Sequence, residues 1–268
     1  MNQRPETTDV DRGPESPVSP LVIEANDALS PRHVSSYLAL AFASGAVNAG
    51  AFLACERFVS HVTGTVTRIG LDLSAPTLMA EYLAVTVSFI AGAMASVAAI
   101  DARAARGRTP RPDLVLHAVG SLLLGVAVVG ELGWFGPFGG ATEETPDFEL
   151  LIALSLAMGA MNAAVASSTA LSVRTTHMTG PATDVGVQLG RAIVFRGEER
   201  RRALGIAGVR GGKIVAFAVG ASVTALTAGA LTHLVFVAPA LVLVGASLRS
   251  FTPAERAAPP EPSRLVVI

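Results

Sequence analysis

Long apolar stretches with almost no charged residues alternate with short charged stretches along most of the chain. The first four apolar stretches are each long enough to cross a bilayer as a helix, which takes about 20 residues. The last two are shorter, so that region is either two full spans or a re-entrant hairpin that turns near Gly229, Thr232 and His233. The pattern predicts an all-α, polytopic membrane helical bundle of about six spans: 34–55, 78–100, 114–134, 148–173, 213–231 and 232–249.

Polar, proline-rich segments lie on both sides of this apolar region. Residues 1–30 contain six acidic residues and four prolines, and 251–268 is also rich in proline. Such segments have too little apolar surface to offset the entropy lost on ordering. We therefore expect a disordered N-terminal tail at 1–33, a membrane domain at 34–250 and a disordered C-terminal tail at 251–268.

A short motif, His-x-Thr-Gly, occurs twice, at His61–Gly64 and at His177–Gly180. The same features surround both copies, because an apolar stretch with one asparagine comes before each and a Phe-x-x-Gly sequence comes after. These features are Asn48 and Phe89–Gly92 for the first copy, and Asn162 and Phe217–Gly220 for the second. The chain therefore contains an internal repeat, which we place at 34–134 and 148–249.

Each repeat contains three predicted spans. Because three is odd, the second repeat must enter the membrane from the opposite side, which makes the pair an inverted-topology repeat. We expect the helix to break at Thr63-Gly64 and at Thr179-Gly180, since glycine releases the backbone and a threonine hydroxyl can satisfy a freed group. Short helices should follow at 65–73 and 181–194, and the two broken or re-entrant segments should meet near the bilayer midplane.

Small residues recur at four-residue spacing within the spans. This spacing lets helix backbones approach closely, which is the main source of packing energy between helices in lipid. For any single pair, however, the general richness of the chain in alanine and glycine is the favoured interpretation. The pairs are Gly45 with Ala49, Gly92 with Ser96, Gly159 with Ala163 and Ala216 with Gly220.

Basic residues cluster in alternate loops. The loops after the second and fourth spans are rich in arginine, whereas all charged residues in the loop after the third span are acidic. The positive-inside rule then places both basic loops and both termini in the cytoplasm. The residues are Arg103, Arg106, Arg108 and Arg111 in the first basic loop, Arg174, Arg191, Arg196, Arg200, Arg201, Arg202 and Arg210 in the second, and Glu143, Glu144 and Asp147 in the acidic loop.

The repeated polar residues are the candidate binding residues for a solute. Histidine can change protonation near neutral pH, relay a proton or bind a ligand, but together with the threonine it can equally cap a broken helix. An asparagine in the middle of a span either bonds to another helix or contacts a ligand. The candidates are Asn48, His61, Thr63, Gly64, Asn162, His177, Thr179 and Gly180.

Two residues of opposite charge, Arg68 and Asp184, occupy equivalent positions after the two histidines. Ionisable residues inside a membrane usually pair with one another or line a water-filled path. Arg68 and Asp184 are therefore a candidate charge pair near the axis that would relate the repeats. The alternative is that both lie unpaired in exposed interfacial loops.

Composition and the lack of known motifs limit the classes of function. Only 15% of the residues are charged and 51% are hydrophobic, whereas soluble domains carry about 25% charged residues. A net charge of −1 gives no indication of a nucleic-acid partner, and the single cysteine, Cys55, excludes an intrachain disulfide. Metal-ligand spacing, a phosphate loop and a dinucleotide fingerprint are all missing from the sequence, so we expect no metal site and no cofactor.

The chain resembles the YoaK-like family of bacterial membrane proteins, whose common domain has no assigned function. The resemblance depends on 58–64 (Phe-Val-Ser-His-Val-Thr-Gly), on 159–163, and on 176–180 with Asp184 and Gly186. It covers about 34–250. It implies a multi-pass protein of the bacterial inner membrane and no settled activity.

Three functional hypotheses fit these observations. The first is a transporter-like protein that binds or moves a small solute or ion near the midplane, where the two His-x-Thr-Gly segments meet. The second is a membrane-embedded enzyme with a histidine as acid or base, and the third is a scaffold or sensor that transports nothing. Inverted repeats with interrupted helices favour the first, and with it a role other than catalysis. The solute, any coupling ion and homo-oligomerisation in the bilayer are left open.

Overall fold

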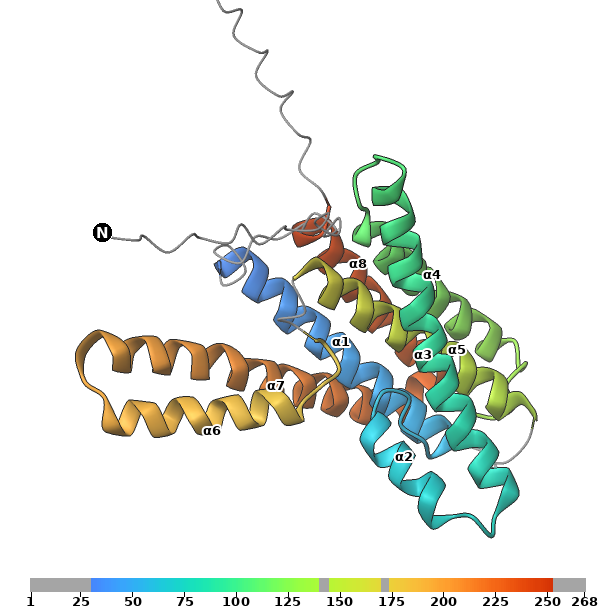
Figure 1. The fold of residues 1–268 in the computed structure, drawn as a ribbon. Helices are drawn as coiled ribbons and strands as arrows, with labels where there is room; N and C mark the ends of the chain where they lie inside the picture. Colours follow the sequence, from blue (N-terminus) through green and yellow to red (C-terminus); the bar gives the residue numbers. More distant parts are fainter. Residues whose placement is uncertain (1–29, 140–144, 170–173, 253–268) are drawn as a thin grey trace, which may run out of the picture.

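A computed structural model describes residues 30–139, 145–169 and 174–252 of the chain (Figure 1). All regular secondary structure within these ranges is helical. The elements are α1 (Pro31–Cys55), α2 (Val62–Leu71), α3 (Pro76–Ala105), α4 (Pro112–Glu131), α5 (Thr145–Ser168), α6 (Thr179–Val194), α7 (Gly197–Leu231), the 3-10 helix η1 (Thr232–Phe236) and α8 (Val237–Ser250). Of the predicted tails at 1–33 and 251–268, residues 1–29 and 253–268 lie outside the described residues, as do 170–173 at the end of the fourth span, Glu143 and Glu144. The end of the first tail is not disordered, because α1 begins at Pro31.

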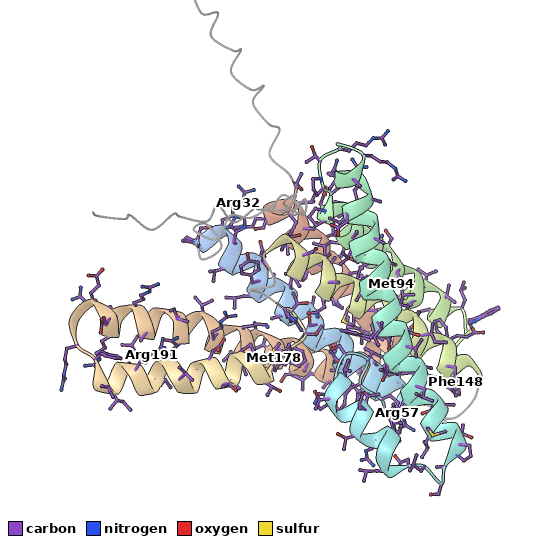
Figure 2. All side chains as sticks on the ribbon, viewed as in Figure 1. Arg32, Arg57, Met94, Phe148, Met178 and Arg191 are labelled. Carbon is purple, nitrogen blue, oxygen red and sulfur yellow. The ribbon has the colours of Figure 1, made fainter. Side chains whose placement is uncertain are left out.

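Long apolar helices identify the fold as a polytopic helical membrane bundle, as the sequence predicts. Within the described ranges, five segments are long and apolar enough to cross a membrane, and the last of them, Gly197–Ser250, contains α7, η1 and α8 together. The outward faces of α3 and α7 are apolar, with large side chains between 42% and 86% exposed. These side chains are Leu83, Val87 and Met94 on α3 and Val215, Val219, Val223 and Leu226 on α7 (Met94 is labelled in Figure 2). A lipid environment accounts for such faces.

The chain turns between α7 and α8 at one of the predicted positions. Thr232 has a φ of 46°, which is uncommon for a residue with a branched Cβ and marks a sharp change of direction. The helix before the turn is longer than predicted, because α7 begins at Gly197 and not near residue 213. Its basic first half packs against α6, and the two form a hairpin that projects from the bundle (Figure 1).

Helix contacts follow the same scheme in both halves of the chain. In the first half α1 packs on α7 and α8, and α2 packs on α3; in the second half α5 packs on α3 and α4, and α6 packs on α7. A further large contact joins α4 to α8 and η1. When η1 is counted with α8, exchanging each helix of the first half for its counterpart four helices later therefore leaves the set of contacting pairs unchanged.

The contact between α1 and α7 is a crossing of two glycine faces. A Cβ on Gly45 would lie 1.9 Å from the carbonyl oxygen of Phe217, and a Cβ on Gly220 would lie 2.0 Å from that of Phe42. Glycine at these positions lets the two backbones touch, and backbone contact of this kind includes weak Cα–H···O interactions. The crossing is reciprocal, since each helix supplies one glycine and one carbonyl.

The same arrangement joins α3 to α5. A Cβ on Gly159 would lie 1.9 Å from the carbonyl oxygen of Phe89, and a Cβ on Gly92 would lie 2.1 Å from that of Leu156. The favoured interpretation of the glycines as general composition is therefore wrong for these four positions. Each Phe-x-x-Gly sequence after a His-x-Thr-Gly motif is one side of a crossing.

The beginning of α1 and the end of α8 meet at one end of the bundle. Arg32 Nε donates to the carbonyl oxygen of Arg249 over 2.6 Å, and the hydroxyls of Ser36 and Ser250 are 2.7 Å apart. The described chain thus enters and leaves the bundle at the same end.

Candidate functional site

The first His-x-Thr-Gly motif lies at the beginning of a helix, and the break in the helical chain lies just before the motif. Helix α1 ends at Cys55, and Glu56 follows with a φ of 55°. Helix α2 begins at Val62, so Thr63 and Gly64 occupy its first turn. The predicted break at Thr63-Gly64 is therefore wrong in position, and α2 spans Val62–Leu71 and not 65–73.

The second motif has the same arrangement. Helix α6 begins at Thr179 and ends at Val194, and residues 174–178 before it are not helical. The observed break therefore lies upstream of Thr179-Gly180, where it was predicted. The predicted end of the helix at 194 is confirmed. Amide groups in the first turn of a helix have no partner within the helix, so a Thr-Gly pair there caps or packs and does not interrupt.

Each histidine ring lies against the glycine of its own motif. A Cβ on Gly64 would lie 2.6 Å from Nδ1 of His61, and a Cβ on Gly180 would lie 2.9 Å from Cδ2 of His177. His177 also accepts a hydrogen bond at Nε2 from the backbone N–H of Gly180 over 3.0 Å. The His61 ring instead packs edge-on against Phe58, with 6.0 Å between ring centroids. His177 thus satisfies an amide in the first turn of α6, as a capping side chain does.

Each asparagine holds the non-helical segment before its motif. Asn48 on α1 donates from Nδ2 to the hydroxyl of Ser60 over 2.6 Å and to the carbonyl oxygen of Ser44 over 2.8 Å, and its Oδ1 accepts from the N–H of Ser60 over 3.2 Å. Asn162 on α5 accepts at Oδ1 from the N–H of Thr176 over 3.4 Å. These bonds satisfy backbone groups that leave the helix, so both asparagines bond locally rather than between spans.

One cavity of about 620 Å³ brings the two repeated motifs together. Its volume lies in the range of binding pockets for small molecules, which is roughly 300–1,000 Å³. The candidate residues that line it are Asn48, His61, Thr63, Asn162, His177 and Thr179. Gly64 and Gly180 do not line it and instead support the histidine rings. Binding of a solute by these candidate residues remains a prediction.

Further residues of the cavity were not predicted from the sequence. The polar ones are Ser60, Arg174 and Thr176, which lie in the non-helical segments just before the motifs. Proximity to the motif is the signal that could have indicated them. The large apolar residues of the lining are Phe58, Val62, Phe89, Ile90, Met178 and Phe217. Two of these, Phe89 and Phe217, begin the Phe-x-x-Gly sequences.

The predicted charge pair between Arg68 and Asp184 is not formed. Arg68 lies 3.9 Å from Asp72, one turn further along the chain, and Asp184 lies 3.3 Å from Arg210 of α7. The reason is the direction of the short helices. Both α2 and α6 begin at the cavity and lead away from it, so residues beyond the first turn move away from the centre. Figure 2 shows this for α6, where Met178 lies at the inner end and Arg191 towards the outer end.

Two buried charged residues hold the non-helical segments. In the first half, Arg57 Nε donates to Glu81 of α3 over 2.8 Å, and their side chains are 12% and 1% exposed. The Arg57 guanidinium also lies over the ring of Tyr82, 5.3 Å from its centroid. In the second half, Lys213 of α7 donates from Nζ to the carbonyl oxygens of Arg174 and His177, the latter over 3.0 Å. An acidic side chain, Glu81, therefore holds the segment before the first motif, and a basic one, Lys213, holds the segment before the second.

Metal-ligating side chains do not gather anywhere in the described ranges, where no group of three His, Cys, Asp or Glu residues could hold an ion.

A family model matches residues 37–248 of the chain, and its description is DUF1275, protein of unknown function. The chain belongs to this family. The match runs from within the first turns of α1 almost to the end of α8 and includes both motifs and every residue that lines the cavity. No curated protein and no solved structure matches the chain. For this DUF1275 protein the function must therefore be argued from the cavity.

Proposed function

We propose that this protein is an integral membrane protein of transporter-like architecture, which binds and moves a small solute or ion at a central site between two inverted repeats. The observation that supports this most is the shared cavity, since His61 and Thr63 line it from the first half and His177 and Thr179 from the second. Many secondary transporters bind their solute in this way, between repeats and at the ends of interrupted helices. The unchanged contact scheme on exchange of the two halves supports the repeat.

The proposal includes the orientation in a bacterial inner membrane. The arginine-rich loop at 103–111 and the α6–α7 hairpin would lie in the cytoplasm together with both termini. The meeting of Arg32 with Arg249 supports termini on one side.

Labelling of single cysteines tests this orientation. In a Cys55→Ser background, a cysteine at Arg201 should react with an impermeant maleimide only from the cytoplasmic side, and a cysteine at Leu132 only from the outside. Leu132 is 81% exposed and follows α4 directly. Reaction of both positions from the same side would contradict the six-span topology.

A bulky side chain in the cavity should abolish solute binding. Ala49 lines the cavity, and a tryptophan there would fill much of its space without removing any polar lining group. Reconstituted protein should be screened for uptake of labelled ions and metabolites, and the uptake found should be lost in Ala49→Trp. Leu226→Trp is the matched control, because Leu226 is 86% exposed on the outer face of α7.

Comparison of these two variants tests whether the transported solute uses this cavity. Both should be purified as monodisperse protein, so that loss of uptake in Ala49→Trp cannot result from unfolding. Equal uptake in Ala49→Trp and the wild type would show that the solute does not use this cavity. An acid or base role for His177 finds no support in the geometry, because its Nε2 is already bonded to Gly180.

A further inference from the structure

The charges around the cavity differ between the two halves. Each non-helical segment contains one arginine, Arg57 before the first motif and Arg174 before the second. Arg57 is paired with the buried Glu81, which neutralises it. Arg174 lines the cavity, and among the described residues its guanidinium has no acidic partner. Within the described ranges, the second half therefore presents to the cavity an arginine that no acidic side chain pairs with.

Other groups strengthen the positive side of the cavity. No aspartate or glutamate is among the residues that line it in the described part of the chain. Lys213 lies directly behind the segment of Arg174 and His177 and bonds to both of their carbonyl oxygens. The first turns of α2 and α6 also face the cavity through Thr63 and Thr179, and the beginning of a helix carries a partial positive charge.

The rest of the lining is mainly apolar. Phe89 and Phe217 lie on it from the two glycine crossings, and Phe58 and Met178 flank the histidines. A bare inorganic anion would leave this surface without a partner, whereas a ligand with an apolar body would cover it.

We propose that the central cavity selects a small soluble organic monoanion, whose carboxylate binds Arg174 and whose apolar body lies between Phe89 and Phe217. This inference rests on the proposed function and adds the class of its solute. Arginine suits the task, because its planar fork can donate two parallel hydrogen bonds to a carboxylate. Lys213 is a positioning residue, since it holds the backbone from which Arg174 extends.

Binding of benzoate to purified protein in phosphatidylcholine nanodiscs tests the proposal. Benzoate carries one carboxylate on an apolar ring, benzamide is its neutral counterpart and benzylamine its cationic one. Benzoate should bind at least about 10-fold more tightly than either, which is the range expected for a hydrogen bond to a charged group. Equal binding of benzamide or benzylamine would overturn the proposal, as would binding of inorganic phosphate or chloride as tight as that of benzoate.

Variants of arginine locate the anion. Arg174→Gln should weaken benzoate binding about 10-fold or more, and Arg174→Lys should weaken it less. Arg191→Gln is the matched control, because it removes the same charge from an exposed position on α6 and should leave binding unchanged. Unaltered affinity in Arg174→Gln would overturn the assignment. Displacement of benzoate when the nanodiscs contain phosphatidylglycerol would overturn it as well, because a lipid would then be the anion.

The outcomes separate this inference from the proposed function. A neutral or cationic solute whose binding is lost in Ala49→Trp would support the proposed function but contradict the inference that the solute is an organic anion. If Ala49→Trp left the binding and uptake of every solute unchanged, both the proposed function and the anion inference would be contradicted.

Discussion

Replacing Gly159 with leucine is expected to prevent folding, and replacing it with alanine to destabilise the protein strongly. A Cβ at this position would lie 1.9 Å from the carbonyl oxygen of Phe89, far inside van der Waals contact. Neither partner can turn away, because both are backbone atoms of packed helices, so α3 and α5 would have to separate. Overpacking of a core typically costs about 1–3 kcal/mol, and a backbone clash should exceed this. Thermal unfolding of detergent-purified protein, followed by size-exclusion chromatography, measures the effect.

Gly125→Ala is the control for this prediction. Gly125 lies within α4, and a Cβ there would meet nothing within 4 Å. Alanine is a better helix former than glycine by about 0.5–1 kcal/mol, so this variant should be as stable as the wild type or more so. If Gly159→Ala unfolded at the same temperature as Gly125→Ala, the close crossing would not be a determinant of the fold.

Replacing Arg57 with methionine is expected to destabilise the protein by about 3–5 kcal/mol. The change removes the guanidinium that pairs with Glu81, whose side chain is 1% exposed, and breaking a buried ion pair from one side has a cost of this size. Replacing both residues, Arg57→Met with Glu81→Met, should recover much of the loss, because the buried carboxylate is then removed together with its guanidinium. The free energies of unfolding of the two single variants and the double variant form the required cycle.

The exposed pair of Asp184 and Arg210 serves as the comparison. Its side chains are 48% and 30% exposed, and such pairs contribute about 0–1 kcal/mol. Asp184→Ala should therefore have little effect on unfolding. If the double variant Arg57→Met, Glu81→Met had the same free energy of unfolding as Arg57→Met alone, this account of the buried ion pair would be contradicted.

The repetition of residues made the centre of this molecule predictable from the sequence. Asn48 and Asn162 stood out because each is the single asparagine of its repeat, and His61 and His177 stood out because the His-x-Thr-Gly motif occurs once per repeat. Residues that must satisfy broken backbone at membrane depth are restricted in type, and this restriction preserves the pattern. The glycine crossings were visible in the same way, as Phe-x-x-Gly after each motif, although composition alone did not distinguish them from other glycines.

The register of the breaks and the charge partners were not predictable in the same way. A Thr-Gly pair fits the middle of a break and the first turn of a helix equally well, so the sequence did not indicate that α2 begins at Val62. Arg68 and Asp184 were equivalent in sequence, but the direction of α2 and α6 decides where they lie. Glu81 and Lys213 could have been noticed as ionisable residues within or beside apolar stretches, since these usually have a partner.

The short final helix limits how the protein can fit its bilayer. Helix α8 has 14 residues, or about 21 Å at 1.5 Å per residue, and η1 adds 5 residues, or about 10 Å at 2.0 Å per residue. Their sum equals the hydrocarbon thickness of about 30 Å, which leaves α8 no excess length to tilt. Helix α3 has 30 residues, about 45 Å, and must lean or extend beyond the lipid. The turn at Thr232 thus makes hydrophobic mismatch unequal around the molecule. The depth of the protein in the bilayer is then set by the lipid beside α8.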